Sequence, residues 1–104
     1  MSSLHKMKSG LVKDLPVGDM NVVKAGDREI LLMHLDTGIY ALDNHCIHGG
    51  CRLVNGTLEK ENLHCPCHNS IFRVKTGDVV SGPATSPQPA YPVILENGEI
   101  ILML

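Results

Sequence analysis

Aromatic residues are scarce in this chain of 104 residues. Tryptophan is absent, and Phe72, Tyr40 and Tyr91 make up the whole aromatic set. A hydrophobic core therefore has to be built mainly from valine, isoleucine, leucine and methionine. The length suffices for one modest core and is too short for two. We expect a single domain over residues 1–104.

Further absences exclude several classes of function. No apolar run approaches the roughly 20 residues needed to span a bilayer, and no apolar stretch of signal-peptide length follows the N-terminus. The formal net charge is −2 and the lysine and arginine residues are scattered, so the chain lacks the basic stripe of a nucleic-acid-binding protein. We expect a soluble, cytoplasmic protein with no membrane span and no nucleic-acid partner.

Short apolar runs bounded by turn residues predict an all-β fold. No segment shows a sustained, capped period of 3.6 residues. Residues 36–38 and 96–98 read as hairpin turns, and the second contains Asn97-Gly98, a pair that tolerates the positive φ of a type I′ turn. We expect strands over residues 17–24, 28–34, 39–42, 92–95 and 99–102.

Two stretches do not fit a strand. Residues 43–52 are rich in cysteine, histidine and glycine, and residues 81–92 hold four prolines. Proline lacks the N–H that a central ladder needs, so the second stretch is predicted to be a stiff surface loop.

Two short segments of the chain are rich in cysteine and histidine. The first is Cys46-Ile47-His48, and after sixteen intervening residues the second is Cys65-Pro66-Cys67-His68. Thiolates and imidazoles suit zinc, copper or an iron–sulfur cluster and disfavour calcium and magnesium. Cys46, His48, Cys65 and His68 are the candidate ligands. A structural zinc knuckle is one interpretation of the same four residues.

The sequence around these ligands resembles the Rieske family. Residues 46–53 are similar to the first Rieske loop and residues 65–72 to the second. Thr76-Gly77-Asp78 resembles the turn that follows, and Gly82-Pro83-Ala84 the proline loop that covers the cluster in that family. The run at residues 38–42 also fits, so the resemblance covers nearly the whole chain.

The resemblance implies an all-β Rieske fold. This fold has an antiparallel, β-sandwich-like base domain and a small cluster-binding subdomain of two loops. The loops would span about residues 43–53 and 64–72, and the proline loop about residues 81–92.

The cofactor that the resemblance implies is one [2Fe–2S] cluster per chain. Cys46 and Cys65 would hold one iron, and His48 and His68 the other. Neutral imidazoles remove negative charge from the ligands and ease reduction. The reduction potential then lies at roughly −150 to +300 mV, against about −400 mV for four-cysteine plant-type clusters.

Further residues near the ligands take roles from the resemblance. Cys51 and Cys67 match the disulfide of Rieske proteins in quinol-oxidising complexes, with two buried thiols as the alternative. Ser70 matches a serine that donates a hydrogen bond to a cluster sulfur, with a polar turn residue as the alternative. Phe72 stands where high-potential members have tyrosine, which predicts an intermediate or low potential. Asn69 replaces a frequent glycine and can take the left-handed conformation.

The residues that flank the ligands have plainer interpretations. His45 and His64 immediately precede ligand cysteines, and we expect them to face solvent or to lie behind the ligands. Asp43 and Asn44 are expected to shape the turn that leads into the first loop.

The leading hypothesis is a monomeric Rieske-type ferredoxin. Resemblance implies that it passes one electron at a time from a flavin-dependent ferredoxin reductase to a terminal oxygenase, so the chain is a carrier and not itself an enzyme. Alternatives within the fold are a small redox subunit of a nitrite-reductase-type enzyme and a soluble relative of the quinol-oxidising Rieske proteins. The alternative of a different class is a zinc-binding structural module.

Overall fold

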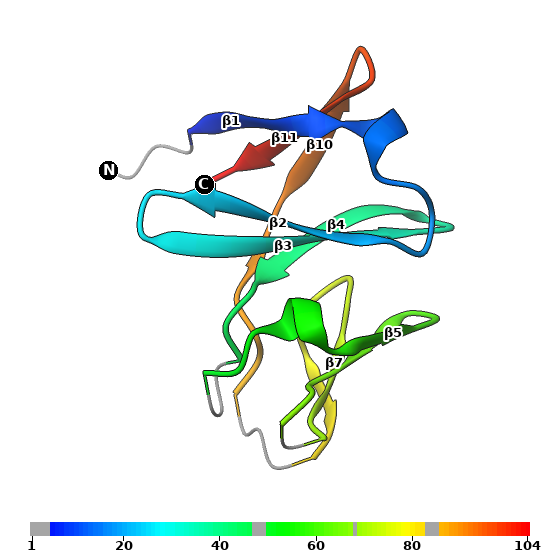
Figure 1. Ribbon diagram of the computed structural model, residues 1–104, viewed down its shortest axis with the longest axis vertical. Coiled ribbons are helices and arrows are strands. Elements are labelled where there is room, and N and C mark those ends of the chain that lie inside the picture. The colour runs from blue at the N-terminus through cyan, green and yellow to red at the C-terminus, as the bar shows by residue number, and fades with distance from the viewer. Residues whose placement is uncertain (1–4, 47–49, 68, 83–85) are drawn as a thin grey trace.

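The computed structural model of the protein describes residues 5–46, 50–67, 69–82 and 86–104 (Figure 1). These residues form three small sheets in which every paired strand is antiparallel. Two sheets make up the upper part of Figure 1, and the third lies below them with the cysteine-containing loops. The predicted all-β fold is confirmed. No helix within the described residues is long and apolar enough to cross a membrane.

The first sheet joins the two ends of the chain. Its order is β1 (Lys6–Leu11), β11 (Glu99–Met103) and β10 (Val93–Glu96). The β10–β11 turn holds Asn97 at φ 52° and Gly98 at φ 78°, so the predicted type I′ hairpin is confirmed. A short 3₁₀ turn, η1 (Val12–Asp14), follows β1.

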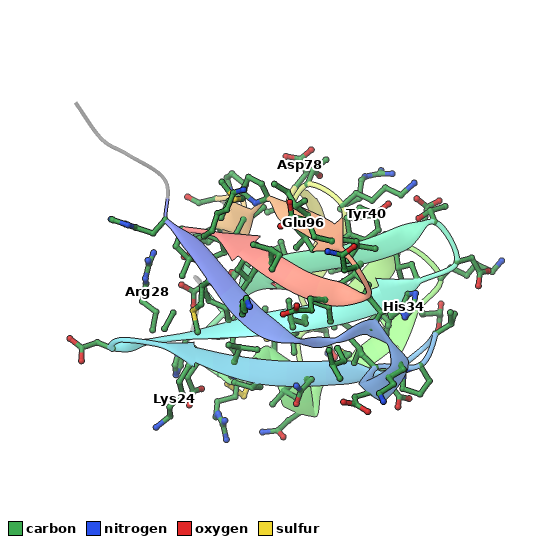
Figure 2. The ribbon with its side chains drawn as sticks, turned by 90° about the horizontal axis from the view of Figure 1, so that it is seen from above. Lys24, Arg28, His34, Tyr40, Asp78 and Glu96 are labelled. Atoms are coloured by element: carbon green, nitrogen blue, oxygen red, sulfur yellow. A yellow bond between two sulfur atoms is a disulfide. The ribbon has the colours of Figure 1, made fainter. Side chains whose placement is uncertain are left out.

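The second sheet has the order β2–β3–β4–β9. Its strands are β2 (Met20–Ala25), β3 (Arg28–Leu35), β4 (Gly38–Asp43) and β9 (Ala90–Tyr91). Figure 2 looks down on this sheet through the first one and labels Arg28 and His34 near opposite ends of β3. The predicted strands at residues 28–34 and 39–42 are confirmed.

The third sheet carries the loops of interest. It has the order β5 (Thr57–Glu59), β6 (Asn62–His64), β7 (Ile71–Arg73) and β8 (Val79–Ser81). A second 3₁₀ turn, η2 (Leu53–Asn55), precedes it.

Strand β3 is buried on both faces, because alternate side chains of a strand point to opposite sides. Ile30 and Leu32 enter the core between the first two sheets, whereas Leu31 and Met33 enter a second core between the second and third sheets. This double burial explains the unbroken apolar run in the sequence. The buried members of the first core are Leu15, Ile30, Leu32, Ile39, Ala41, Ile100 and Leu102. Those of the second are Leu31, Met33, Leu35, Leu42, Cys46, Leu53, Leu63, Cys65, Phe72 and Val74.

One predicted strand and one predicted loop need correction. The strand predicted over residues 17–24 begins only at Met20, because the amide of Asp19 donates to the Pro16 carbonyl at 3.0 Å and closes a turn. Gly18 sits in that turn at φ 93°.

The predicted proline loop is also not all loop. Ala90–Tyr91 forms β9, which pairs with β4 at the edge of the second sheet. An edge strand needs a ladder on one side only and so tolerates flanking prolines.

Two glycines with similar backbone angles provide a matched test of packing. Gly98 has φ 78° and open space where a Cβ would lie, while Gly77 has φ 82° and the Gln88 carbonyl oxygen in that space. Gly98→Ala should lower the free energy of unfolding by about 1–2 kcal/mol, the cost of a left-handed L-residue. Gly77→Ala adds overpacking and should cost about 2–5 kcal/mol. Urea denaturation followed by circular dichroism measures both, and equal losses would contradict the packing argument.

Candidate metal centre

Cys46 and Cys65 stand at the heads of two loops with the same backbone design. The Cys46 amide donates to the Cys51 carbonyl at 2.7 Å, and the Cys65 amide donates to the Ser70 carbonyl at 2.7 Å. Each loop is thus closed by a bond between a cysteine and the residue five positions later. Gly50, at φ 76°, completes the first loop by donating to the Cys46 carbonyl.

The side chains of Cys46 and Cys65 are deeply buried thiols, and neither forms a disulfide. Cys46 is 2% exposed and Cys65 is 1% exposed, and both belong to the second core. Cys65 directly follows strand β6, and Cys46 lies three residues after the end of strand β4. Since β3 pairs with β4 and packs on the core that contains both thiols, the fold fixes the starting point of each loop.

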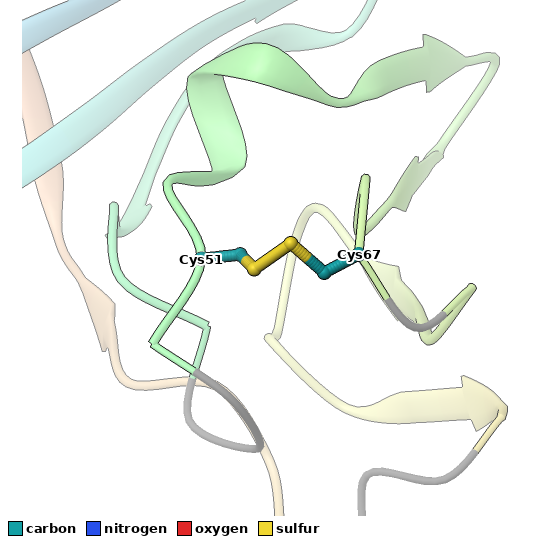
Figure 3. Close-up of a disulfide and its surroundings, with 2 residues drawn as sticks. All are labelled: Cys51 and Cys67. Carbon is teal, nitrogen blue, oxygen red and sulfur yellow. A yellow bond between two sulfur atoms is a disulfide. The ribbon is translucent and has the colours of Figure 1, made fainter.

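A disulfide between Cys51 and Cys67 joins the two loops, as the sequence predicted (Figure 3). Their Cα atoms are 6.3 Å apart, and the residues are 16 positions apart in the chain. Cross-links that close loops of this size stabilise by about 3 kcal/mol in the chain-entropy model. The two loops therefore form one covalently linked unit.

The predicted histidine ligands His48 and His68 lie outside the described residues, as do Pro83 and Ala84 of the proline loop. Within the described part of the chain, no three His, Cys, Asp or Glu side chains gather as a metal site. Two buried thiols at the heads of twin, cross-linked loops nevertheless fit the cysteine half of an iron–sulfur centre, since thiolate is the ligand that such clusters take.

The second loop continues through Asn69 and Ser70. Asn69 has φ 59°, so the expected left-handed conformation is confirmed. Ser70 is fully buried. A Cβ on Gly82 would stand 2.5 Å from the Ser70 Cα and 2.9 Å from the Asn69 carbonyl oxygen. Only glycine fits there, and it lets the start of the proline loop lie directly on the second loop.

Asn44 holds the first loop in place, and the expectation that it shapes the preceding turn is confirmed. The residue is fully buried. Its Oδ1 accepts from the Val54 amide at 2.9 Å, and its carbonyl accepts from the Leu53 amide at 2.6 Å. Its Nδ2 donates to Glu29 Oε1 at 3.0 Å. Asn44 thus connects both ends of the first loop to strand β3.

Asp43 contributes to the same turn. Its Oδ1 accepts a hydrogen bond from the His45 amide at 3.0 Å. The His45 side chain is 48% exposed, as expected for a residue that faces solvent, and His64 is half-buried.

Glu29 is a residue that sequence reasoning missed. Besides Asn44, Arg52 donates to its carboxylate from Nε at 3.1 Å and from Nη2 at 3.4 Å, and His45 Nε2 lies 3.7 Å away. The hydrogen bond from Asn44 and then the guanidinium of Arg52 lower the pKa of Glu29 below its usual value, against partial desolvation. A single glutamate in a strand gives no sequence signal for these partners.

Gln88 was missed as well. It is 1% exposed in the middle of the proline stretch, and its Nε2 donates to the carbonyls of Asp43 and His45. A lone glutamine among prolines resembles any surface-loop residue in sequence.

Comparisons with known proteins agree with the resemblance to the Rieske family that the sequence showed. The family model for the Rieske [2Fe-2S] domain matches residues 5–92. The chain is 40% identical over 91 residues to the ferredoxin component of the naphthalene 1,2-dioxygenase/salicylate 5-hydroxylase systems of a Ralstonia species, covering 88% of each chain.

Two solved structures are similar over nearly the whole fold. One is a chain from the complex of reduced oxygenase and oxidized ferredoxin in carbazole 1,9a-dioxygenase, with TM-score 0.90, 28% identity and coverage of 94% of this chain and 92% of that one. The other is the Sphingomonas yanoikuyae B1 ferredoxin, with TM-score 0.89, 25% identity and coverage of 96% and 99%.

The lowered pKa of Glu29 predicts a pH-dependent contribution to stability. A depressed carboxyl pKa stabilises the fold above the unfolded value of about 4.5, and that stabilisation is lost as the pH falls through the folded pKa. Glu29→Gln keeps an acceptor for Asn44 and removes the charge. Its free energy of unfolding should therefore be below that of the wild type at neutral pH, and the difference should shrink on acidification below about pH 4.5.

Urea denaturation at a series of pH values measures this difference. Glu96→Gln, at an exposed position of β10, is the matched control and should show a smaller difference. If the difference in the free energy of unfolding between wild type and Glu29→Gln stays constant from neutral to acid pH, the lowered pKa of Glu29 is refuted.

Proposed function

The chain belongs to the Rieske [2Fe–2S] domain family, and from this membership we propose that it is the ferredoxin component of an oxygenase system. It takes one electron at a time from a flavin-dependent reductase and delivers it to a terminal oxygenase. The carrier itself performs no catalysis. The observation that carries the proposal is the 40% identity to a dioxygenase ferredoxin component over 88% of both chains.

The proposed ligand set follows the family pattern. Cys46 and Cys65 would hold one iron of a single [2Fe–2S] cluster, and His48 and His68 the other. When bound, the cluster supplies a centre that accepts and releases one electron. The protein contributes buried thiols, loops that are shaped by their own hydrogen bonds, and a cross-link between the loops. These features support the proposal because they place the two cysteine ligands in one covalently linked unit.

One observation favours a second candidate, a soluble relative of the quinol-oxidising Rieske proteins. Those proteins supply the pattern that Cys51 and Cys67 match, and the disulfide is formed here. Phe72 opposes this candidate, because it is fully buried and has no hydroxyl to bond a ligand sulfur. Since the similarity runs to a dioxygenase ferredoxin component, the ferredoxin remains our proposal over this candidate and over the nitrite-reductase-type subunit.

The first test is whether the purified protein holds a Rieske cluster and transfers its electron. Anaerobically prepared protein should elute from size-exclusion chromatography at the mass of one chain and carry one cluster's iron and acid-labile sulfide. Its reduced form should give a Rieske electron paramagnetic resonance signal. With NADH and the reductase and oxygenase of the Ralstonia relative's system, it should restore product formation when it replaces their own ferredoxin.

A matched pair of histidine variants provides the control. His48→Ala should abolish the Rieske signal, whereas His45→Ala, at a half-exposed neighbour, should retain it. A colourless, zinc-containing protein would refute the function. A reduction potential above about +150 mV, in the upper part of the Rieske range, would count for the quinol-oxidising candidate.

Ser70 is proposed to donate a hydrogen bond to a cluster sulfur. It is fully buried, and a bond to the more negative, reduced centre raises the potential. Ser70→Ala should therefore lower the reduction potential by about 20–65 mV, the equivalent of one net hydrogen bond of about 0.5–1.5 kcal/mol. Protein-film voltammetry measures the shift. Ser81→Ala, at an exposed position in β8, should leave the potential unchanged, and an unchanged potential in Ser70→Ala would rule out the bond.

A further inference from the structure

Gln88 is a buried polar residue in an otherwise exposed segment. Its neighbours Ser86, Pro87, Pro89 and Ala90 are all exposed, whereas Gln88 is 1% exposed. Burying a primary amide is unfavourable unless its N–H groups find acceptors. The segment therefore turns this one side chain inward to meet specific partners.

Those partners are two backbone carbonyls of the first cluster-binding loop. Gln88 Nε2 donates to the Asp43 carbonyl at 2.7 Å and to the His45 carbonyl at 2.6 Å. An amide nitrogen has two hydrogens, so both are used. The two acceptors flank Asn44, and His45 is followed directly by Cys46. The side chain is thus hydrogen-bonded to the backbone that leads into the first cysteine ligand, Cys46.

The backbone around Gln88 strengthens the same attachment. The Gln88 amide donates to the Gly77 carbonyl at 2.7 Å, and the Asp43 amide donates to the Pro89 carbonyl at 2.9 Å. Gly77 belongs to the turn between β7 and β8, beyond the second cluster-binding loop. Gln88 is therefore the point where the proline loop meets both the first loop and this turn.

Prolines explain why a side chain has to make this connection. Pro87 and Pro89 have no N–H to donate, so the segment cannot extend a backbone ladder along the first loop. The glutamine amide supplies two donors in their place. At the other end of the proline loop, Gly82 lies against the Cα of Ser70. The proline loop is thus fastened to one cluster-binding loop at each end.

We propose that Gln88 is a positioning residue that latches the segment of residues 86–90 onto the first cluster-binding loop and thereby holds the backbone that carries Cys46, so that the cluster is retained. The proposal rests on the proposed function, because it needs a cluster at Cys46 and Cys65. Gln88 acts through the backbone on either side of Asn44 and has no direct role in electron transfer.

The test removes the donors while preserving the length of the side chain. Gln88→Met and Gln88→Glu each lack the amide N–H groups. In both holoproteins, loss of visible absorbance to a chelator such as EDTA should be at least tenfold faster than in the wild type. The reduction potential should rise, because a first loop that is held less firmly admits water, which stabilises the extra negative charge of the reduced centre. Gln88→Asn, whose shorter amide cannot reach both carbonyls, should give an intermediate rate and serves if the other variants do not fold.

Hydrogen exchange separates a local latch from general destabilisation. In Gln88→Met the amides of Asp43 and Gln88 should exchange faster, while those of Leu31 and Leu32 in β3 should exchange as in the wild type. Asn21→Met, the same change of an amide side chain at an exposed site in β2, should alter none of these quantities.

The outcomes are distinguishable from failure of the proposed function. A wild-type protein without a Rieske spectrum would overturn the function itself. A normal wild-type spectrum combined with wild-type chelator kinetics in Gln88→Met would overturn only the latch. Exchange that accelerates equally across the chain would also overturn it, since a merely structural role predicts that result.

Discussion

The double burial of strand β3 is the constraint on which the rest of the structure depends. Ile30 and Leu32 complete the core between the first and second sheets, and Leu31 and Met33 complete the core between the second and third sheets. Because one rigid strand serves both cores, the two parts of the molecule cannot shift independently without exposing apolar surface. The second core also contains Cys46 and Cys65. The position of the thiols is thereby coupled to the most deeply buried element of the fold.

In the loops outside the sheets, polar side chains form hydrogen bonds with backbone groups, as neighbouring strands do within a sheet. Asn44 satisfies backbone groups of the first loop and donates to Glu29, and Gln88 donates to the carbonyls of Asp43 and His45. Buried amides of this kind are favourable only when all their partners are present. They therefore favour one arrangement of the loops over its alternatives. This explains how a small domain, in which the strands next to the loops are short, presents a defined site.

Local signals in the sequence predict the parts of this structure that depend on local physics. The run in β3, the Asn97-Gly98 turn and the twin cysteine loops each follow from spacing or backbone preference. The strands of the third sheet contain three residues each, too few for an alternating pattern to be recognised. Strand β1 was missed because only Ser9 of its six residues is buried. Glu29 and Gln88 matter through partners distant in the chain, which a single sequence does not reveal.

The disulfide joins the two loops through a covalent bond that does not involve the cofactor. A site that forms only when its metal binds draws the cost of ordering from the binding energy. Here Cys51–Cys67 joins the loops, and the bonds from Cys46 to Cys51 and from Cys65 to Ser70 close each one. Ordering costs are thus met on folding, and more of the binding energy is available to retain the cluster. The same feature exposes a weakness in a reducing compartment, because Cys67 is exposed and open to thiol exchange. Gln88 makes a second connection, between the first loop and the β7–β8 turn of the third sheet, and this connection contains no sulfur and is indifferent to redox conditions.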